Sequence, residues 1–306
     1  MVDVRVRVPV APGDPELVRQ LADAAEAVDG HPPVGDAVWR DLDQPGPDTA
    51  LLLAYDEERP VGALHLTRTE DGAPRFTLAV VVDPAHRQSG VARELVARAI
   101  DLVRERGGGN IELWAFGADT RADAFAQAEG FTLERELLQL RVGLPLGEEP
   151  RWPPGVGVRT FDPGRDQDEW VAVNNRAFRG DPDQGGWTVK TLRRRENEPW
   201  FDPSAFLLAH DDRGLAGFCW TKVHPATPPY EPAALGEIYV IGVDPDRQGS
   251  GLGRALVVAG LESLAGRGID TGMLFVDAAN EPAVRLYQTL GFEMSRADRA
   301  YARIVS

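Results

Sequence analysis

The stretch Gln248-Gly249-Ser250-Gly251-Leu252-Gly253 is the most informative part of this chain. It follows an apolar run that ends at Val243 and precedes a helical pattern over about 251–267. A glycine-rich turn between a strand and a helix exposes backbone N–H groups at the helix N-terminus, and these favour a bound phosphate or pyrophosphate. The turn lacks the Lys-Ser/Thr pair of a Walker A loop and the spacing of a dinucleotide fingerprint. A tight turn without a ligand stays the alternative.

The same order of sequence signals occurs twice along the chain. Three landmarks of the first half recur in the second at a constant offset of 161 residues: Asp83, Gly90 and Gly130 recur as Asp244, Gly251 and Gly291. In each half, short apolar runs alternate with helical patterns, which predicts an α/β fold with a mixed sheet. The constant offset indicates one domain that has been duplicated in tandem.

A segment rich in proline and glycine separates the two halves. It covers residues 143–155 and has the sequence GLPLGEEPRWPPG, a composition typical of an interdomain linker. We therefore predict an N-terminal domain over 1–142, a linker over 143–155 and a C-terminal domain over 156–306.

The composition excludes several classes of protein. The 306 residues include 33 Lys and Arg against 48 Asp and Glu, a formal net charge of −15, which disfavours nucleic-acid binding. No apolar stretch approaches the roughly 18 residues of a membrane span, and residues 1–9 lack the apolar core of a secretory signal. The single cysteine, Cys219, excludes an internal disulfide or a cysteine zinc cluster. We expect a cytoplasmic monomer that binds no membrane.

The histidines do not indicate a metal site either. The chain has five, and their positions do not show the spacing of metal ligands: His31, His65, His86, His210 and His224. We therefore predict that the protein holds no metal.

A second motif follows the glycine-rich turn. Residues 280–292 have the sequence NEPAVRLYQTLGF, and residues 239–245, before the turn, have the sequence YVIGVDP. With these motifs each half resembles the GNAT acetyltransferase superfamily over nearly its whole length. The resemblance implies two tandem GNAT domains and acetyl-CoA as co-substrate, with the turn on the pyrophosphate and the Asn-to-Tyr segment near the pantetheine arm. The implied cofactor contacts are Ile241, Gly242, Val243, Gln248, Gly249, Ser250, Gly251, Leu252, Gly253, Arg254, Asn280, Glu281, Pro282, Ala283, Val284 and Arg285.

Two ionisable residues of the second half match the catalytic positions of that family. Glu237 would act as the base for the amine, directly or through a water, and Tyr287 would protonate the departing thiolate. The backbone N–H groups at the strand end 241–243 could hydrogen-bond the thioester oxygen. The alternatives are a solvated surface glutamate and a core aromatic residue.

The first half lacks both of these groups. At the offset of 161, Glu237 and Tyr287 correspond to Phe76 and Ala126. A related turn remains at residues 87–92, RQSGVA, in which Ala92 replaces the last glycine. We therefore predict that the second half is catalytic, while the first half binds coenzyme A weakly, structurally or not at all and supplies part of the substrate cleft. Its candidate cofactor contacts are Val80, Val81, Val82, Gln88, Ser89, Gly90, Val91, Ala92 and Arg93.

Three further segments resemble the mycothiol synthases, tandem acetyltransferases of actinobacteria. They are DQGGWT at 183–188, WTKVHP at 220–225 and GEIYV at 236–240. This resemblance implies acetylation of the cysteinyl amine of a small-molecule substrate, cysteinyl-glucosaminyl-inositol. Asp36 is shorter than the Glu common at its position, and Phe275 lacks the hydroxyl of the usual Tyr. The implied substrate contacts are Asp36, Asp183, Lys222, Glu237 and Phe275.

Each of these assignments has an alternative. Asp36 and Asp183 could be loop acids of an acidic protein, and Lys222 could be an ordinary surface lysine. A tandem acetyltransferase for another amine, such as an aminoglycoside or a protein N-terminus, is a further alternative, and the acidic charge would suit a cationic aminoglycoside. A non-enzymatic acyl-CoA sensor is the other alternative function, but a sensor would not need Glu237 and Tyr287 together.

Overall fold

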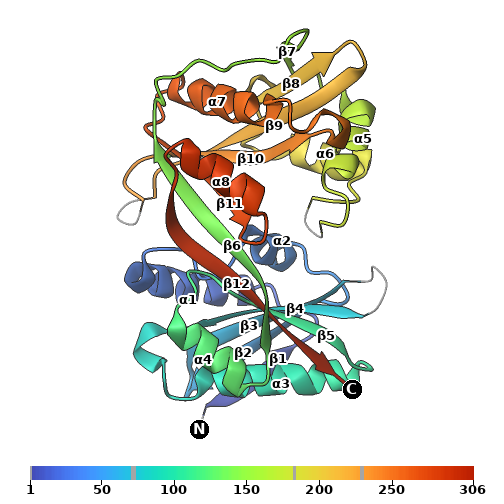
Figure 1. Ribbon diagram of the computed structural model, residues 1–306. Helices are drawn as coiled ribbons and strands as arrows, with labels where there is room; N and C mark the ends of the chain where they lie inside the picture. Colours follow the sequence, from blue (N-terminus) through green and yellow to red (C-terminus); the bar gives the residue numbers. More distant parts are fainter. Residues whose placement is uncertain (1, 70–73, 182–183, 228–230) are drawn as a thin grey trace. The chain divides into compact units, whose positions relative to one another are not determined.

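The computed structural model describes residues 2–69, 74–181, 184–227 and 231–306 (Figure 1). Its internal contacts divide the chain into two compact units. Unit 1 consists of residues 1–138, 277–279 and 296–306, and unit 2 consists of residues 139–276 and 280–295. Two strands, β6 (Thr132–Gly143) and β12 (Glu293–Val305), each run through both units.

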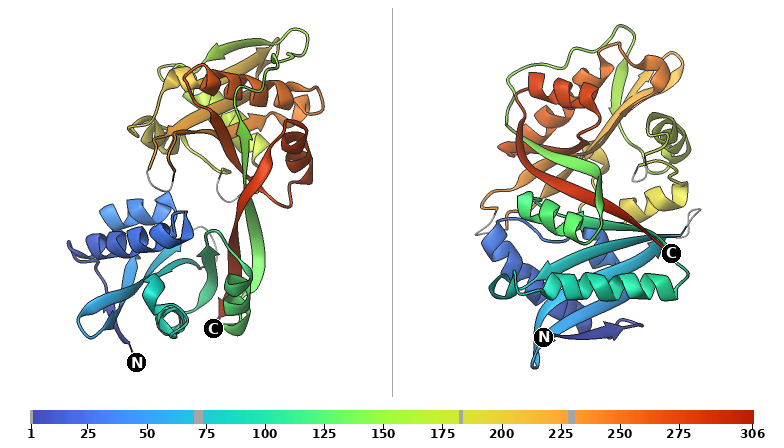
Figure 2. Two further views of the ribbon diagram at one scale, coloured as in Figure 1. Left: turned by 90° about the vertical axis from the view of Figure 1, so that its left-hand side faces the viewer. Right: turned by 60° about the horizontal axis from the view of Figure 1, so that its bottom comes forward.

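Unit 1 is a mixed sheet with helices on both faces (Figure 2). Strands follow the order β1-β2-β3-β4-β5, and then the unit 1 parts of β12 and β6. The step from β4 to β5 is parallel, and α3 connects these strands. The elements are β1 (Asp3–Arg7), α1 (Asp14–Asp29), α2 (Asp36–Asp43), β2 (Ala50–Asp56), β3 (Arg59–Thr69), β4 (Arg75–Val82), α3 (Val91–Glu105), β5 (Gly109–Ala115) and α4 (Thr120–Ala128).

Alternation along the strands separates the two cores of unit 1. Leu52 and Ala54 of β2 pack with α3, whereas Leu51 and Leu53 of the same strand pack with α1 and α2. Neighbouring residues of a strand point to opposite faces, so a continuous apolar run predicts a strand covered on both sides. The 51–54 run therefore forms a central strand.

Unit 2 repeats this plan. Strands follow the order β6-β11-β10-β9-β8-β7, and the step from β10 to β11 is parallel. Helix α7 packs on β9 and β10, with Cys219 and Gly217 of β9 on its side of the sheet. An aromatic core that includes Trp170, Phe218 and Trp220 covers the other face. The elements are β7 (Gly157–Thr160), α5 (Gln167–Ala177), α6 (Val189–Glu196), β8 (Phe206–Asp211), β9 (Gly214–His224), β10 (Leu235–Val243), α7 (Leu252–Ala265), β11 (Thr271–Asp277) and α8 (Glu281–Thr289).

The repeated plan agrees with the predicted duplication, but the units do not follow the predicted ranges. The end of β12, Arg299–Val305, pairs antiparallel with β5, so the C-terminal residues complete the sheet of unit 1. The predicted ranges 1–142 and 156–306 each contribute residues to both units, because a strand pattern specifies a strand but not its partner. The linker range 143–155 is held to unit 2 through the hydrogen bond from Leu144 N to Asp270 O.

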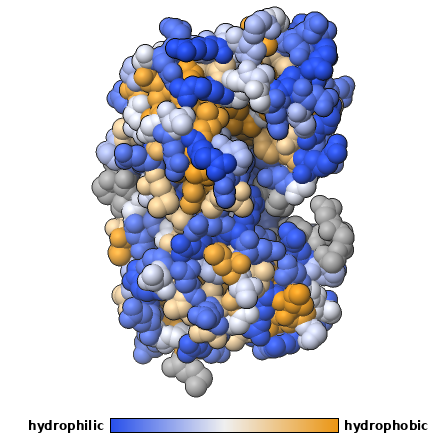
Figure 3. Space-filling view, viewed as in Figure 1, coloured by the Kyte–Doolittle hydropathy of each residue, from blue (hydrophilic) through white to orange (hydrophobic). Residues whose placement is uncertain are grey.

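Hydrophilic residues cover most of the face drawn in Figure 3, with apolar patches between them. Among the described residues, no helix is long and apolar enough to cross a membrane.

Candidate functional site

The glycine-rich turn of unit 2 connects β10 to α7. Gly249 and Gly251 have φ angles of +77° and +88°, in the left-handed region that favours glycine. An added Cβ on either would meet no atom within 4 Å, so open space borders the backbone here. Gly251 is the N-cap of α7 and has no side chain to cap the helix, although Ser250 Oγ lies 3.4 Å from Leu252 N. The next N–H groups, of Gly253 and Arg254, precede the first intrahelical bond and suit an anion.

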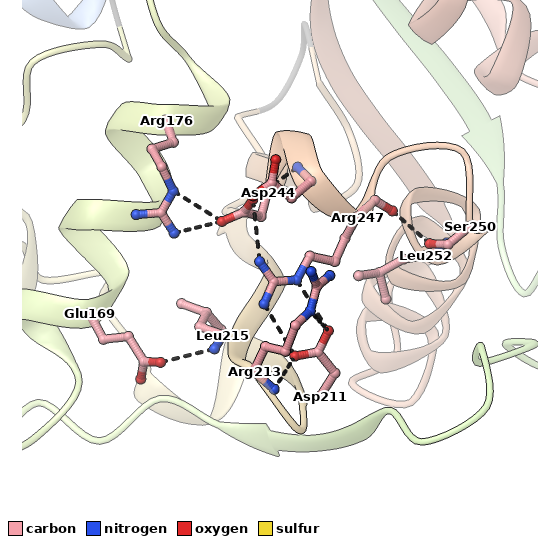
Figure 4. A network of polar contacts seen from close by, with 10 residues as sticks. Glu169, Arg176, Asp211, Arg213, Leu215, Asp244, Arg247, Ser250 and Leu252 are labelled. Atoms are coloured by element: carbon pink, nitrogen blue, oxygen red, sulfur yellow. Dashed lines mark hydrogen bonds and ion pairs between the residues drawn. The ribbon is translucent and has the colours of Figure 1, made fainter.

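Buried charges anchor this turn (Figure 4). Asp244, at the end of β10, accepts hydrogen bonds from Arg176 of α5 at 2.5 and 3.1 Å and from the N–H of Asp246 at 3.0 Å. Burial acts to raise the pKa of the Asp244 carboxyl, but the bonds from Arg176 and the backbone outweigh it and hold this pKa below its usual range. Arg247 donates to Asp211 at 3.1 Å, which ties the turn to the β8–β9 hairpin.

A cavity of about 640 Å³ borders the turn on its β8–β9 side. Its lining includes Gln248 and Gly249 but neither Glu237 nor Tyr287. Three carboxylates also line it, those of Asp211, Asp212 and Asp246. The two predicted reacting groups, Glu237 and Tyr287, thus lie outside this cavity.

Glu237 lies where β10 and β11 separate. The two strands are paired at Gly236–Gly272 and Glu237–Met273, and among the described residues this pairing goes no further. Glu237 is 8% exposed, and its Oε2 lies 2.7 Å from Nε2 of His224. A carboxylate at this position has a fixed partner on one oxygen, because both residues lie on paired strands of the sheet.

Lys222 lies directly opposite Glu237 in the β9–β10 pair. Its Nζ is 5.0 Å from the ring centroid of Trp200 and 5.8 Å from that of Tyr239, within the range of a cation–π interaction. Directly opposite residues of an antiparallel pair share a face of the sheet, so the ammonium and the carboxylate lie on the same side. The structure thus brings together two of the predicted substrate contacts.

Tyr287 lies on α8 and is 7% exposed. Its ring packs on Phe292, with 5.6 Å between the centroids. Burial and the nearby Cys219 sulfur raise the pKa of the Tyr287 hydroxyl, so this group keeps its proton at neutral pH, as a proton donor must. Burial also raises the pKa of Cys219 to about 12, in agreement with a small core residue.

Two further predicted contacts of unit 2 lie on β11 and at the start of α8. Asn280 caps α8, and its Oδ1 accepts from Ala283 N at 3.3 Å. Phe275 of β11 is 37% exposed. Asp183 lies outside the described residues. Asp36 is the first residue of α2 and belongs to unit 1, not to the unit that carries Glu237.

Unit 1 keeps the turn but not the reacting groups. Gln88 and Gly90 have φ angles of +61° and +91°, close to those of Gly249 and Gly251. A left-handed glutamine costs about 1–2 kcal/mol. The turn of unit 1 nevertheless has the same conformation, although Gln88 stands where unit 2 has Gly249. At the positions that correspond to Glu237 and Tyr287, however, Phe76 is fully buried in the core and Ala126 is 1% exposed.

His224 is a partner of Glu237 that the sequence does not single out. Its spacing from the other histidines does not suit a metal site, and among the described residues no group of three or more His, Cys, Asp and Glu side chains could hold a metal ion. The available signal was alternation: His224 follows Lys222 by two residues on one strand and so shares its face.

Comparison with known proteins identifies the class first. The model of the acetyltransferase (GNAT) family matches this chain twice, at residues 16–131 and 169–292. Two solved structures share the fold. A GCN5-related N-acetyltransferase from Sphaerobacter thermophilus has a TM-score of 0.75 at 22% identity and covers 99% of this chain and 96% of its own. A tandem GNAT protein from the clavulanic acid biosynthesis pathway has a TM-score of 0.76 at 20% identity, with 100% and 99% covered. These matches confirm the predicted tandem GNAT fold.

Sequence relatives then identify the family within this class. The mycothiol acetyltransferase of Thermobispora bispora is 43% identical over 98% of this chain and 99% of its own length. That of Thermomonospora curvata is 44% identical over 94% of both chains. That of Streptomyces coelicolor is 41% identical over 95% of this chain and 92% of its own. The chain therefore belongs to the mycothiol acetyltransferases, within the GNAT family of N-acetyltransferases.

Proposed function

We propose that the protein transfers the acetyl group of acetyl-CoA to the cysteinyl amine of cysteinyl-glucosaminyl-inositol, the last step of mycothiol biosynthesis. The observation that carries the proposal is the buried Glu237, which lies at the point where β10 leaves β11. The same strand leads into the glycine-rich turn, and the N-cap residue of the helix after the turn has no side chain to cap it. Membership of the mycothiol acetyltransferases supports this substrate. We expect the protein to act as a monomer in the cytoplasm.

The turn of unit 2 fits acetyl-CoA. The N–H groups of residues 249–254 would hold the pyrophosphate, because open space borders Gly249 and Gly251 and a helix N-terminus attracts anions. The backbone of Ile241, Gly242 and Val243, beyond the pairing with β11, would face the pantetheine arm and the thioester oxygen. Residues 280–285, the start of α8, would border the arm. When bound, acetyl-CoA supplies an activated acetyl thioester.

The side chains of unit 2 supply two proton transfers. Glu237 accepts a proton from the amine as its nitrogen forms a bond to the acetyl carbon. Tyr287 donates its phenolic proton to the sulfur as the carbon–sulfur bond breaks. A proton from solvent then restores the phenol, and the carboxyl group returns its proton to solvent. Asp36, Asp183, Lys222 and Phe275 would contact the hydroxyl-rich substrate.

Unit 1 would not catalyse the reaction. Phe76 cannot accept a proton, and Ala126 cannot donate one. We propose that unit 1 has at most a weak or structural site for coenzyme A. The turn at residues 88–93, with Val80, Val81 and Val82 before it, would form this site.

The matched glycines Gly251 and Gly90 test which unit works. Both have φ near +90°, so Gly251→Ala and Gly90→Ala carry a similar backbone cost of about 1–2 kcal/mol. We expect Gly251→Ala to raise the KM for acetyl-CoA about tenfold, because the turn must rearrange. Gly90→Ala should leave turnover and this KM unchanged. Steady-state kinetics and thermal unfolding of both variants make the comparison, and the reverse pattern would assign catalysis to unit 1.

Direct assay of the amine tests the proposed substrate. The purified protein is mixed with acetyl-CoA and cysteinyl-glucosaminyl-inositol, and acetylated product is followed by mass spectrometry beside a panel of aminoglycosides and a peptide amine. We expect rapid acetylation of the cysteinyl amine alone. Turnover of another amine only would retain the acetyltransferase and discard this substrate. Binding of acetyl-CoA without turnover of any amine would favour a non-enzymatic acyl-CoA sensor.

A further inference from the structure

The partner of Glu237 is a histidine that the chemistry above does not use. His224 Nε2 lies 2.7 Å from Glu237 Oε2, a short hydrogen bond. The glutamate side chain is 10% exposed, whereas the histidine side chain is 31% exposed. The carboxylate is therefore the more buried member of the pair, and the imidazole has more contact with solvent.

The sheet holds this pair in register. His224 is the last residue of β9 and lies opposite Leu235, two residues before Glu237 on β10. The two side chains are thus diagonal neighbours on one face of an antiparallel ladder. Backbone pairing on both sides fixes their separation, and it does so at the point where β10 leaves β11.

We propose that His224 is a positioning residue for Glu237 in acetyl transfer. The inference depends on the proposed role of Glu237 as the base. A carboxylate has two oxygens, and only one of them needs to face the amine. An imidazole N–H that donates to Oε2 stops rotation of the carboxylate and leaves Oε1 to accept the amine proton. Such a bond to an ionised acceptor is stronger than a neutral one, so it can hold an otherwise mobile glutamate.

The proton balance of the step is unchanged by this histidine. The proton leaves the amine nitrogen for Oε1 of Glu237, and His224 keeps its own proton throughout. Its contribution is geometric, since a misplaced base loses much of its effect. A residue of this kind should affect kcat through Glu237 and leave the binding of acetyl-CoA, at the turn, unchanged.

Three variants test the inference. We expect His224→Ala to lower kcat about 10- to 100-fold. His224→Gln, whose amide can donate to the carboxylate from a similar distance, should recover most of this loss. Adding His224→Ala to Glu237→Gln should cause no further loss, because the group that it positions no longer accepts a proton. The Kd for acetyl-CoA and the melting temperature should stay near those of the parent protein.

A second histidine of unit 2 provides the matched control. His210 of β8 is 24% exposed and lies 3.6 Å from the carboxylate of Glu169. Its Nε2 also lies 3.3 Å from Nη2 of Arg159. His210→Ala makes the same change in a half-buried histidine away from β10, and we expect kcat to stay within about twofold of the parent value.

The outcomes separate this inference from the function on which it rests. Wild-type kcat in His224→Ala, or an equal fold-loss in the parent and Glu237→Gln backgrounds, would overturn the role of His224 alone. Wild-type kcat in Glu237→Gln would remove the proposed base itself. If His224→Ala fails to fold, His224→Leu and His224→Gln carry the same comparison, because both fill the volume and only glutamine donates a hydrogen bond.

Discussion

Glu237→Gln should lower kcat by about 10²- to 10⁴-fold, the usual contribution of a positioned general base. Glutamine has the same shape and can still accept a hydrogen bond, but its amide does not take up the amine proton. The loss corresponds to about 3–5 kcal/mol of transition-state stabilisation. Because the turn at 248–253 is unchanged, the Kd for acetyl-CoA by calorimetry should stay within about twofold.

A matched glutamate separates this effect from a loss of stability. Glu262 of α7 accepts a hydrogen bond from the N–H of Leu146 at 2.9 Å and has no part in the proposed chemistry. Glu262→Gln should therefore keep its kcat. Undiminished turnover in Glu237→Gln, with the protein folded, would exclude Glu237 as the base.

Tyr287→Phe should lower kcat about 10- to 100-fold, because the thiolate would leave without its proton donor. The variant removes only the hydroxyl, and the ring that packs on Phe292 remains. Burial keeps the pKa of this hydroxyl above its usual value of about 10, so the wild-type donor stays protonated over the neutral range. Loss of Tyr287 should therefore lower kcat by a similar factor from about pH 6 to pH 9.

The leaving group offers a sharper readout for Tyr287. An acetyl thioester of a more acidic thiol needs less protonation as it departs, so the defect of Tyr287→Phe should shrink with such a donor. Tyr301 of unit 1 is the control: its hydroxyl donates to Asp123 at 2.7 Å, and Tyr301→Phe should cost stability but not kcat. An equal defect with both thioesters would show that Tyr287 has no role as the acid.

Much of unit 2 could be predicted from local sequence. The glycine-rich sequence predicts a tight turn at the start of a helix, and the structure has left-handed φ angles of +77° and +88° at Gly249 and Gly251. The side chain of Asn280 caps the helix that carries Tyr287, a local interaction typical of asparagine. The offset of 161 residues predicts the duplication that the two GNAT matches confirm. Turns and caps depend on residues close in the chain, and a duplication is visible when two segments of the sequence are compared, so sequence patterns alone can indicate them.

Tertiary structure decided which distant residues meet. The sequence marks Glu237 as an isolated acid on a strand, and only the register of β9 against β10 places His224 at 2.7 Å from it. The sequence also predicts a final strand over about 292–304, yet pairing with β5 assigns the end of this strand to unit 1. Strand pairing and burial depend on contacts between residues far apart in the chain, and side-chain pattern specifies a face but not a partner. Sequence alone therefore determined the turn and the duplication and suggested the reacting groups, while the fold decided which of these groups are buried and which side chains lie against them.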